Sequence, residues 1–154
     1  MVGDGPDALI DRNLAIPMLH RAIEAGINYI DTAVGYCNRD SQRVVGEAIQ
    51  GKREQLIIST KNPYYGEEER VWWQNLEDSL QRLRTDYIDI YNHHGVNAKA
   101  FREAILPRLS KWMEKAKAQG LIKHICLSFH DNNEALREIV ASGYPEVITV
   151  QYNL

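Results

Sequence analysis

The stretch Ile27–Tyr36, Ile-Asn-Tyr-Ile-Asp-Thr-Ala-Val-Gly-Tyr, decides how the rest of the chain is interpreted. Its first residues alternate between apolar and polar, as a short β-strand does. Gly26 before the strand predicts the end of a helix, and Gly35 predicts a turn. Asp31 therefore lies where the strand ends, and Tyr36 lies in the loop that follows. A carboxylate and a phenol at the carboxyl end of a strand suggest proton chemistry, although an Asp there also commonly forms a turn or caps a helix.

The composition is that of an ordinary soluble globular protein, with 154 residues, 44% of them hydrophobic and 25% charged. A net charge of −3 gives no footprint for nucleic acid or an anionic membrane. No apolar run approaches the roughly 20 residues of a spanning helix, and the segment around Asp4 and Pro6 lacks the pattern of a signal peptide. Cys37 and Cys126 form no Cys-x-x-Cys motif, which favours free thiols in a reducing compartment. These features predict one domain, residues 1–154, in the cytoplasm.

Strand and helix patterns alternate along the whole chain. Strands are expected at Ile27–Asp31, Leu56–Thr60, Tyr87–Tyr91, Leu121–Leu127 and Val147–Val150. The segments between them carry apolar residues at helical spacing, for example the stripe through Trp72 and Leu76. Pro17 is expected only in the first turn of its helix, and Pro107 is expected to divide or kink another. Strands separated by helices in this way predict a parallel sheet built from right-handed crossovers.

Two layouts compete for such a sheet, a doubly wound open sheet and a (β/α)₈ barrel. No strand is followed by Gly-x-Gly-x-x-Gly or by a phosphate-binding Gly-x-x-x-x-Gly-Lys-Ser, the usual marks of the nucleotide-binding open sheet. Instead, each strand finishes near a polar residue: Asp31, Lys61, His94, Ser128 and Gln151. Polar residues at successive carboxyl ends converge on one mouth, which is how barrel active sites are assembled. The sequence therefore predicts an α/β fold of the (β/α)₈ TIM-barrel type.

Four short motifs at these strand ends carry a family resemblance. They are Asp31-Thr32-Ala33, Tyr36, Ser59-Thr60-Lys61 and Asp89-Ile90-Tyr91-Asn92-His93-His94. In order and spacing they resemble the signature of the aldo-keto reductases, and the similarity runs from about Leu14 to the last residue. The resemblance implies a catalytic tetrad of Asp31, Tyr36, Lys61 and His94. It also implies that Ser128 and Gln151 contact the nicotinamide carboxamide of NADPH or NADH.

The resemblance is partial in two respects. Ser128-Phe129-His130-Asp131 departs from the commoner Ser-Asn of the family and resembles a branch whose members often carry a C-terminal iron–sulfur module, for which this chain has no cysteine cluster. A complete barrel typically takes about 250 residues, and this chain supplies what look like strands two to six. The family's first strand and its last two units, which normally hold the adenosine phosphate of the cofactor, have no counterpart here. The expectation is a partial aldo-keto reductase barrel.

The chemistry of carbonyl reduction suits these residue types. Adding hydride to an aldehyde or ketone requires a proton for the developing alkoxide. A tyrosine hydroxyl such as that of Tyr36 gives up its proton reluctantly, and a nearby ammonium, here Lys61, favours the ionised form. Asp31 is expected to pair with Lys61 and fix its position. A neutral His94 is expected to donate a hydrogen bond that orients the substrate carbonyl, while the cofactor carries the hydride.

Other interpretations of the same residues stay open. Asp31 with His93 and His94 suggests a metal site, but adjacent histidines on a strand point to opposite faces, so at most one serves a given site. Lys61 also suits a Schiff-base lyase or isomerase, or a solvated loop. The family includes members that act as binding partners of channels. The favoured function is therefore a nicotinamide-dependent oxidoreductase, and the alternative is a non-catalytic barrel fragment or binding subunit.

Strand number predicts a partner in addition to a small carbonyl substrate. Five parallel strands cannot close a barrel that requires eight. The strands Ile27–Asp31 and Val147–Val150 would then be open edges, each exposing unpaired backbone groups, and the inner face of the sheet would be uncovered. A second copy of the chain or a complementing fragment would cover both.

Overall fold

The structure, a computed structural model, describes residues 10–152. Residues 1–9 and 153–154, which include the segment compared with a signal peptide and the end of the family resemblance, lie outside the described residues. The five strands are β1 (Tyr29–Asp31), β2 (Ile57–Asn62), β3 (Ile88–Val96), β4 (Ile122–Phe129) and β5 (Val147–Thr149). The α-helices are α1 (Arg12–Glu24), α2 (Tyr36–Arg39), α3 (Ser41–Ala48), α4 (Glu69–Leu83), α5 (Ala98–Ala100), α6 (Ser110–Ala118) and α7 (Asn133–Ala141). A short 3₁₀ turn, η1 (Arg53–Gln55), and a π-helical segment, η2 (Phe101–Leu109), complete the elements.

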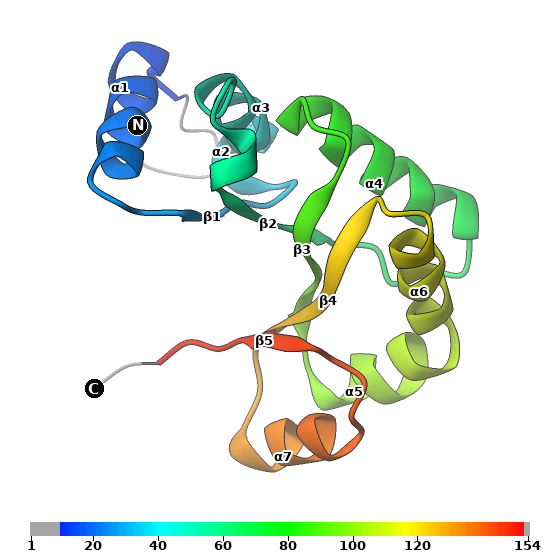
Figure 1. The fold of residues 1–154 in the computed structure, drawn as a ribbon. Helices are drawn as coiled ribbons and strands as arrows, with labels where there is room; N and C mark the ends of the chain where they lie inside the picture. The colour runs from blue at the N-terminus through cyan, green and yellow to red at the C-terminus, as the bar shows by residue number, and fades with distance from the viewer. Residues whose placement is uncertain (1–9, 153–154) are drawn as a thin grey trace.

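The strands form one sheet in the order β1-β2-β3-β4-β5, and every neighbouring pair is parallel. Strands adjacent in the sequence are therefore adjacent in space, whereas a doubly wound sheet reverses its order at a switch point. The sheet is curved, with α3, α4, α6 and α7 along its outer side and its inner side open between β1 and β5 (Figure 1). The predicted fold class is confirmed as a half-barrel of five βα units.

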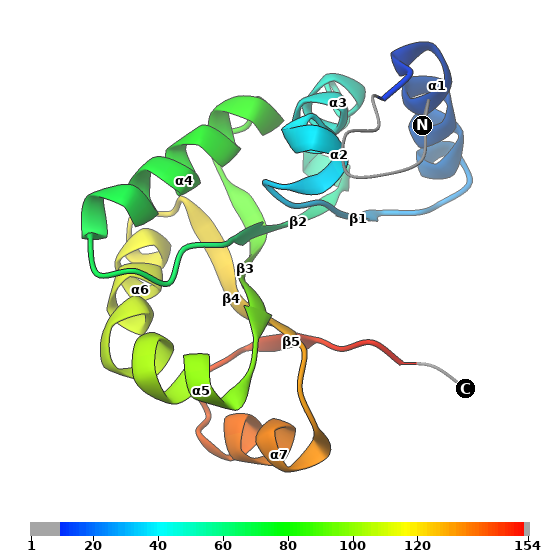
Figure 2. The same cartoon turned by 180° about the vertical axis from the view of Figure 1, so that it is seen from behind.

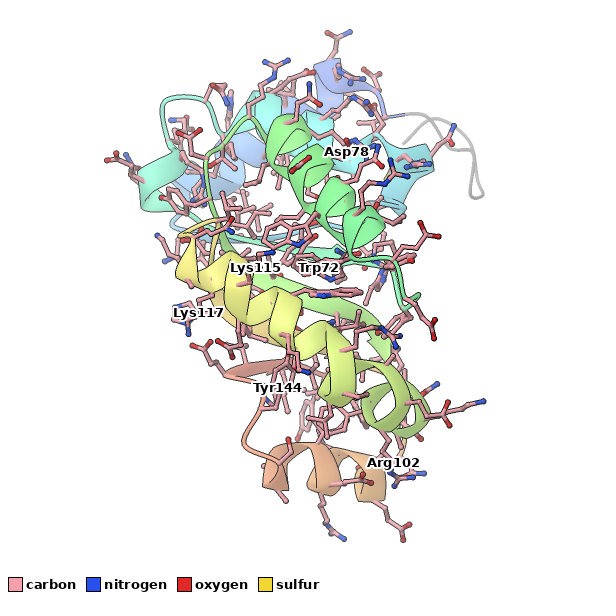
Figure 3. The ribbon with its side chains drawn as sticks, turned by 90° about the vertical axis from the view of Figure 1, so that its right-hand side faces the viewer. Trp72, Asp78, Arg102, Lys115, Lys117 and Tyr144 are labelled. Carbon is pink, nitrogen blue, oxygen red and sulfur yellow. The ribbon has the colours of Figure 1, made fainter. Side chains whose placement is uncertain are left out.

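The core lies between the sheet and the outer helices. Trp72 and Leu76, one turn apart on α4, are fully buried, as the helical stripe predicted. The Trp72 ring packs edge-on against Tyr91 of β3, with 6.0 Å between ring centroids. Trp72 lies beneath α4 on the side of the sheet and α6 (Figure 3). The helix layer thus seals the outer face of the sheet with aromatic and aliphatic side chains.

Proline positions differ from the sequence expectation in one case. α1 begins at Arg12, with Asp11 as its N-cap, so Pro17 lies beyond the first turn. The helix tolerates it because α1 buries none of its residues and Asn13, whose carbonyl loses its usual donor, is exposed. Pro107 lies within η2, and the wider π-helical turn accommodates a residue without an N–H before α6 continues from Ser110.

Side chains alternate between the two faces of each strand. The register sets Asp31 beside Ser59 and Lys61 beside Asn92, all on the inner face. His93 therefore points to the outer face, where it is fully buried and its Nε2 lies 2.9 Å from the Tyr144 hydroxyl. Burial lowers the pKa of His93 from 6.5 to about 3, so the imidazole is neutral in the folded protein.

This burial predicts a loss of stability in acid. Below pH 6.5 an unfolded His93 takes up a proton, whereas the folded residue stays neutral down to about pH 3. The free energy of unfolding should therefore fall as the pH is lowered through this window, by on the order of 5 kcal/mol if the whole shift is realised. His93→Leu should flatten that pH dependence relative to the unchanged protein in urea unfolding at several pH values. His130→Gln, at an exposed histidine, serves as the control, and equal slopes in the two variants would contradict the expectation.

The open inner side of the sheet predicts self-association of the 154-residue chain. Tyr29 on the edge strand β1 and Ile57, its register partner on β2, are 41% and 38% exposed. Edge strands with exposed apolar side chains pair with other chains. Light scattering at low micromolar concentration should detect a dimer or larger species, and Tyr29→Lys should weaken it. Val140→Lys, on the outer helix α7 and 58% exposed, should not. A monomer with well-protected edge-strand amides in hydrogen exchange would overturn this expectation.

Candidate active site

The four tetrad positions come from three strand ends and one turn. Asp31 ends β1, Lys61 lies in the last part of β2, His94 lies in β3, and Tyr36 begins α2. Lys61 Nζ lies 2.5 Å from Asp31 Oδ2 and 4.9 Å from the centroid of the Tyr36 ring. The Tyr36 and His94 rings meet edge-on with 6.2 Å between centroids. The structure therefore brings all four predicted residues together.

Lys61 is the most buried member of the group, with 3% of its side chain exposed, against 33% for Asp31. Its ammonium donates to the Asp31 carboxylate and, over 2.8 Å, to the Thr32 carbonyl. An ammonium taken out of water is strongly unfavourable unless such partners meet it. The hypothesis that Lys61 is a solvated loop residue is therefore wrong, because Lys61 lies in β2 and its side chain is buried.

A relay of hydrogen bonds through two buried side chains, Ser59 and Asn92, holds the Asp31 carboxylate. Ser59 Oγ donates to Asp31 Oδ1 over 2.7 Å, and Asn92 Nδ2 donates to Ser59 Oγ over 3.0 Å. Asn92 also donates to the Thr60 carbonyl, and both Ser59 and Asn92 are fully buried. Ser59 and Asn92 belong to the motifs at the strand ends, but the sequence alone indicated no role for them. The signal was present, since each is two residues before a tetrad position and so shares its face of the strand.

Tyr36 is presented by a strained turn. Cys37 and Asn38 both have φ of 51°, and Arg39 has φ of 65°. Non-glycine residues in this left-handed region cost on the order of 1 kcal/mol each. The turn leaves Tyr36 42% exposed at the rim of the site. Its hydroxyl has no hydrogen-bond partner among residues 10–152, so it is available to a ligand. In many enzymes the catalytic hydrogen bonds shorten and align only when the ligand is bound.

His94 is held neutral by its surroundings. Burial, together with the positive charge of Lys61 and the proximity of His130, lowers the pKa of His94 below its ordinary 6.5, against the opposing effect of Asp31. At neutral pH its ring therefore carries one N–H for donation. The neighbouring His93 points to the opposite face and bonds Tyr144. The two histidines do not share a site, as strand alternation predicted.

Ser128 and Gln151 lie on the β4–β5 side of the half-barrel. Ser128 is buried in β4, with its Oγ 3.4 Å from His130 Nε2, and Gln151 is exposed just beyond β5. A hollow of about 460 Å³ lies beside them. Its lining consists of Phe129, His130, Asp131, Asn133, Leu136, Val150, Gln151 and Tyr152. Gln151 therefore lines this hollow, whereas Ser128 does not, although the two residues that follow it in the chain, Phe129 and His130, do.

Among residues 10–152, no group of three or more His, Cys, Asp or Glu side chains has the arrangement of a metal site. No helix within that range is long and apolar enough to cross a membrane. Cys37 and Cys126 are not joined in a disulfide.

Comparisons with known proteins agree on one family. The sequence model of the aldo/keto reductase family matches residues 2–154. An uncharacterized oxidoreductase, YqkF, of Bacillus subtilis is 32% identical over 94% of this chain and 49% of its own length. An NADH-specific methylglyoxal reductase of Escherichia coli is 30% identical over 99% of this chain and 53% of its own length. The chain therefore spans about half the length of these curated relatives.

Solved structures give the same result. An aldo/keto reductase from Klebsiella pneumoniae, crystallised with NADP and acetate, superposes with a TM-score of 0.78 at 28% identity, over 92% of this chain and 49% of that one. An aldo-keto reductase from Bacillus halodurans superposes with a TM-score of 0.76 at 30% identity, over 98% of this chain and 53% of that one. With a family match over nearly its whole length and a half-barrel that fits those enzymes, the chain belongs to the aldo/keto reductase family.

Proposed function

We propose that this chain carries the catalytic residues of a nicotinamide-dependent reductase acting on a small aldehyde or ketone. The observation that carries the proposal is the contact of Lys61 with both the Asp31 carboxylate and the Tyr36 ring at the strand ends. Proton chemistry needs an acid, a charge beside it and a group that fixes that charge. Relatives named as methylglyoxal reductases support a small carbonyl substrate.

In this proposal Tyr36 is the general acid. Its exposed hydroxyl donates a proton to the oxygen of the substrate carbonyl as negative charge develops there. The Lys61 ammonium beside the ring stabilises the phenolate that remains, and Asp31 keeps Lys61 in place. The neutral imidazole of His94, edge-on to Tyr36, donates a hydrogen bond that orients the carbonyl oxygen. The relay through Ser59 and Asn92 holds the Asp31 carboxylate, a positioning role.

The residues on the β4–β5 side fit the amide end of a nicotinamide. A carboxamide presents one acceptor oxygen and two donor hydrogens. Ser128 offers a hydroxyl that donates and accepts, and Gln151 offers an exposed amide at the hollow. We propose these two residues as its contacts, with NADPH or NADH as the cofactor. When bound, the nicotinamide supplies the hydride that reduces the carbonyl carbon.

A second candidate is a non-catalytic barrel fragment or binding subunit. It is favoured by the open five-stranded sheet and by the chain's coverage of about half of its relatives. In this case residues 1–154 act as one domain that docks through its edge strands with a second copy or with a complementing fragment. A reducing cytoplasm stays the predicted location for either function.

The acid assignment predicts the effect of Tyr36→Phe. The variant keeps the ring and its contact with Lys61 but lacks the proton, so turnover of methylglyoxal with NADPH or NADH should fall at least about a hundredfold. Cofactor affinity, measured by fluorescence quenching, should stay within about twofold. Tyr87→Phe makes the same change just before the amino end of β3, away from the tetrad residues, and should leave turnover unaltered. Unchanged turnover in Tyr36→Phe would sink the assignment, and absence of turnover in the unchanged chain would favour the second candidate.

The cofactor assignment predicts weak dinucleotide binding by the 154 residues. Ser128 and Gln151 meet only the nicotinamide end, so NADPH should bind more weakly than to a complete barrel of the family. Gln151→Ala should weaken it further, and Gln119→Ala, at an exposed glutamine beyond α6, should not. Calorimetry that finds NADPH bound as tightly as by a full-length relative would contradict this expectation.

A further inference from the structure

Four arginines gather where α3 meets the carboxyl end of α4. This arginine cluster consists of Arg39, Arg43, Arg82 and Arg84. Three of its members, Arg43, Arg82 and Arg84, line a hollow of about 270 Å³ together with Glu47 and Gln81. α3 and α4 lie side by side in the helix layer, on the outer side of the sheet (Figure 2). The hollow is therefore separate from the open inner face that carries Asp31 and Lys61.

Close helix packing brings these guanidinium groups together. A Cβ added to Gly46 of α3 would lie 2.3 Å from the Arg82 carbonyl oxygen, a distance that real contacts do not reach. Only glycine therefore lets the two backbones approach at this point. The approach sets Arg43, one turn before Gly46, opposite Arg82 and Arg84. Arg43 also donates to the Arg39 carbonyl over 3.3 Å, which draws the turn after α2 into the cluster.

The Arg82 guanidinium has N–H donors that no acceptor among the described residues meets. Its side chain is only 12% exposed, and Nη1 is buried with no hydrogen-bond partner among the described residues. Nη2 makes a single long contact, 3.4 Å to Asp78 on the previous turn of α4. A guanidinium carries five N–H donors, and buried ones are normally met. Burial, and then the charges of Arg43 and Arg39, lower the pKa of Arg82 against the opposing effect of Asp78.

The carboxylates around the cluster do not balance it. Glu47 is shared, 3.2 Å from Arg12 and 3.7 Å from Arg84, and Asp40 is paired with Arg12 at 2.9 Å. Asp78 is the third carboxylate within reach. Counting Arg12, five guanidiniums thus face three carboxylates among residues 10–152. The surplus is two positive charges, in a chain whose overall charge is −3.

Arg84 occupies a position that a glycine would fill with less strain. It caps α4 with φ of 53° and ψ of 47°, the left-handed conformation that most helix ends give to glycine. An arginine is therefore present at this helix end although the backbone conformation favours glycine. Its side chain reaches the rim of the hollow, where 56% of it is exposed.

We propose that the arginine cluster binds a compact phosphate-type dianion, such as the phosphoryl group of a small phosphorylated metabolite. Two negative charges match the local surplus of two positive charges. Planar guanidiniums meet phosphate oxygens through paired N–H donors, which gives both affinity and orientation. The hollow has room for a phosphoryl group and a small substituent. Its size and the acidic chain around it exclude a nucleic-acid strand.

Calorimetric titration of the 154-residue chain with inorganic phosphate and with pyrophosphate tests the site. Sodium chloride keeps the ionic strength constant, because general salt effects on the protein must be separated from binding. Pyrophosphate should bind more tightly than phosphate, and acetate, with one charge, should bind weakly. Arg43→Gln and Arg84→Gly should each reduce affinity about tenfold, the effect of losing one hydrogen bond to a charged group.

The Arg84→Gly variant separates binding from folding. Glycine suits the left-handed cap, so this variant should unfold at the same temperature as the unchanged chain or a higher one while binding phosphate less well. Arg137→Gln, at an exposed arginine of α7 away from the cluster, should bind as the unchanged chain does. The proposal is overturned if phosphate does not bind, if acetate binds as tightly, or if Arg84→Gly and Arg137→Gln retain equal affinity.

Discussion

The ion pair between Asp31 and Lys61 is the interaction on which the rest of the site depends. Its two halves are unequally buried, with 3% of the lysine side chain exposed and 33% of the aspartate side chain. Removing one partner of a buried pair costs about 3 to 5 kcal/mol, because a charge is left without water or counter-ion. The pair also ties the short edge strand β1 to β2. The position of Tyr36 follows from it, since the lysine ammonium lies against the face of that ring.

The outer face of the sheet packs the core, and the inner face carries the polar groups of the candidate site. The outer face packs against helices through residues such as Trp72 and Leu76, and even its histidine, His93, is neutral and buried against Tyr144. The inner face carries the polar groups in hydrogen-bonded order, from Asn92 through Ser59 to Asp31. Adjacent residues in β3, His93 and His94, therefore belong to different environments. His93 packs in the core, and His94 provides a hydrogen-bond donor whose pKa is lowered below 6.5.

The incomplete barrel sets the limits of what this chain does by itself. The sheet and the turn after β1 bring Asp31, Tyr36, Lys61 and His94 together, and the chain covers about half the length of its relatives. Among residues 10–152, the edge strands β1 and β5 pair with one strand each, so their outer backbone groups have no strand partner within that range. In a closed barrel the same backbone groups are paired with a neighbouring strand.

Much of the fold, and the proximity of Asp31, Tyr36, Lys61 and His94, was predictable from the sequence, because strand alternation, helix spacing and turn residues are local properties. Strand ends at Asp31 and Lys61 could be located by pattern, and parallel order then brought them together. Longer-range features were not predictable. β3 continues to Val96, past the predicted end at Tyr91, because it pairs with β4 as far as His93 and again, after a register shift, at Val96. The sequence by itself determined which residues stand at the barrel mouth. Only the tertiary structure decided how Ser59 and Asn92 hold Asp31, and how the close approach of two helices at Gly46 gathers the arginines, because both require contacts between residues distant in the chain.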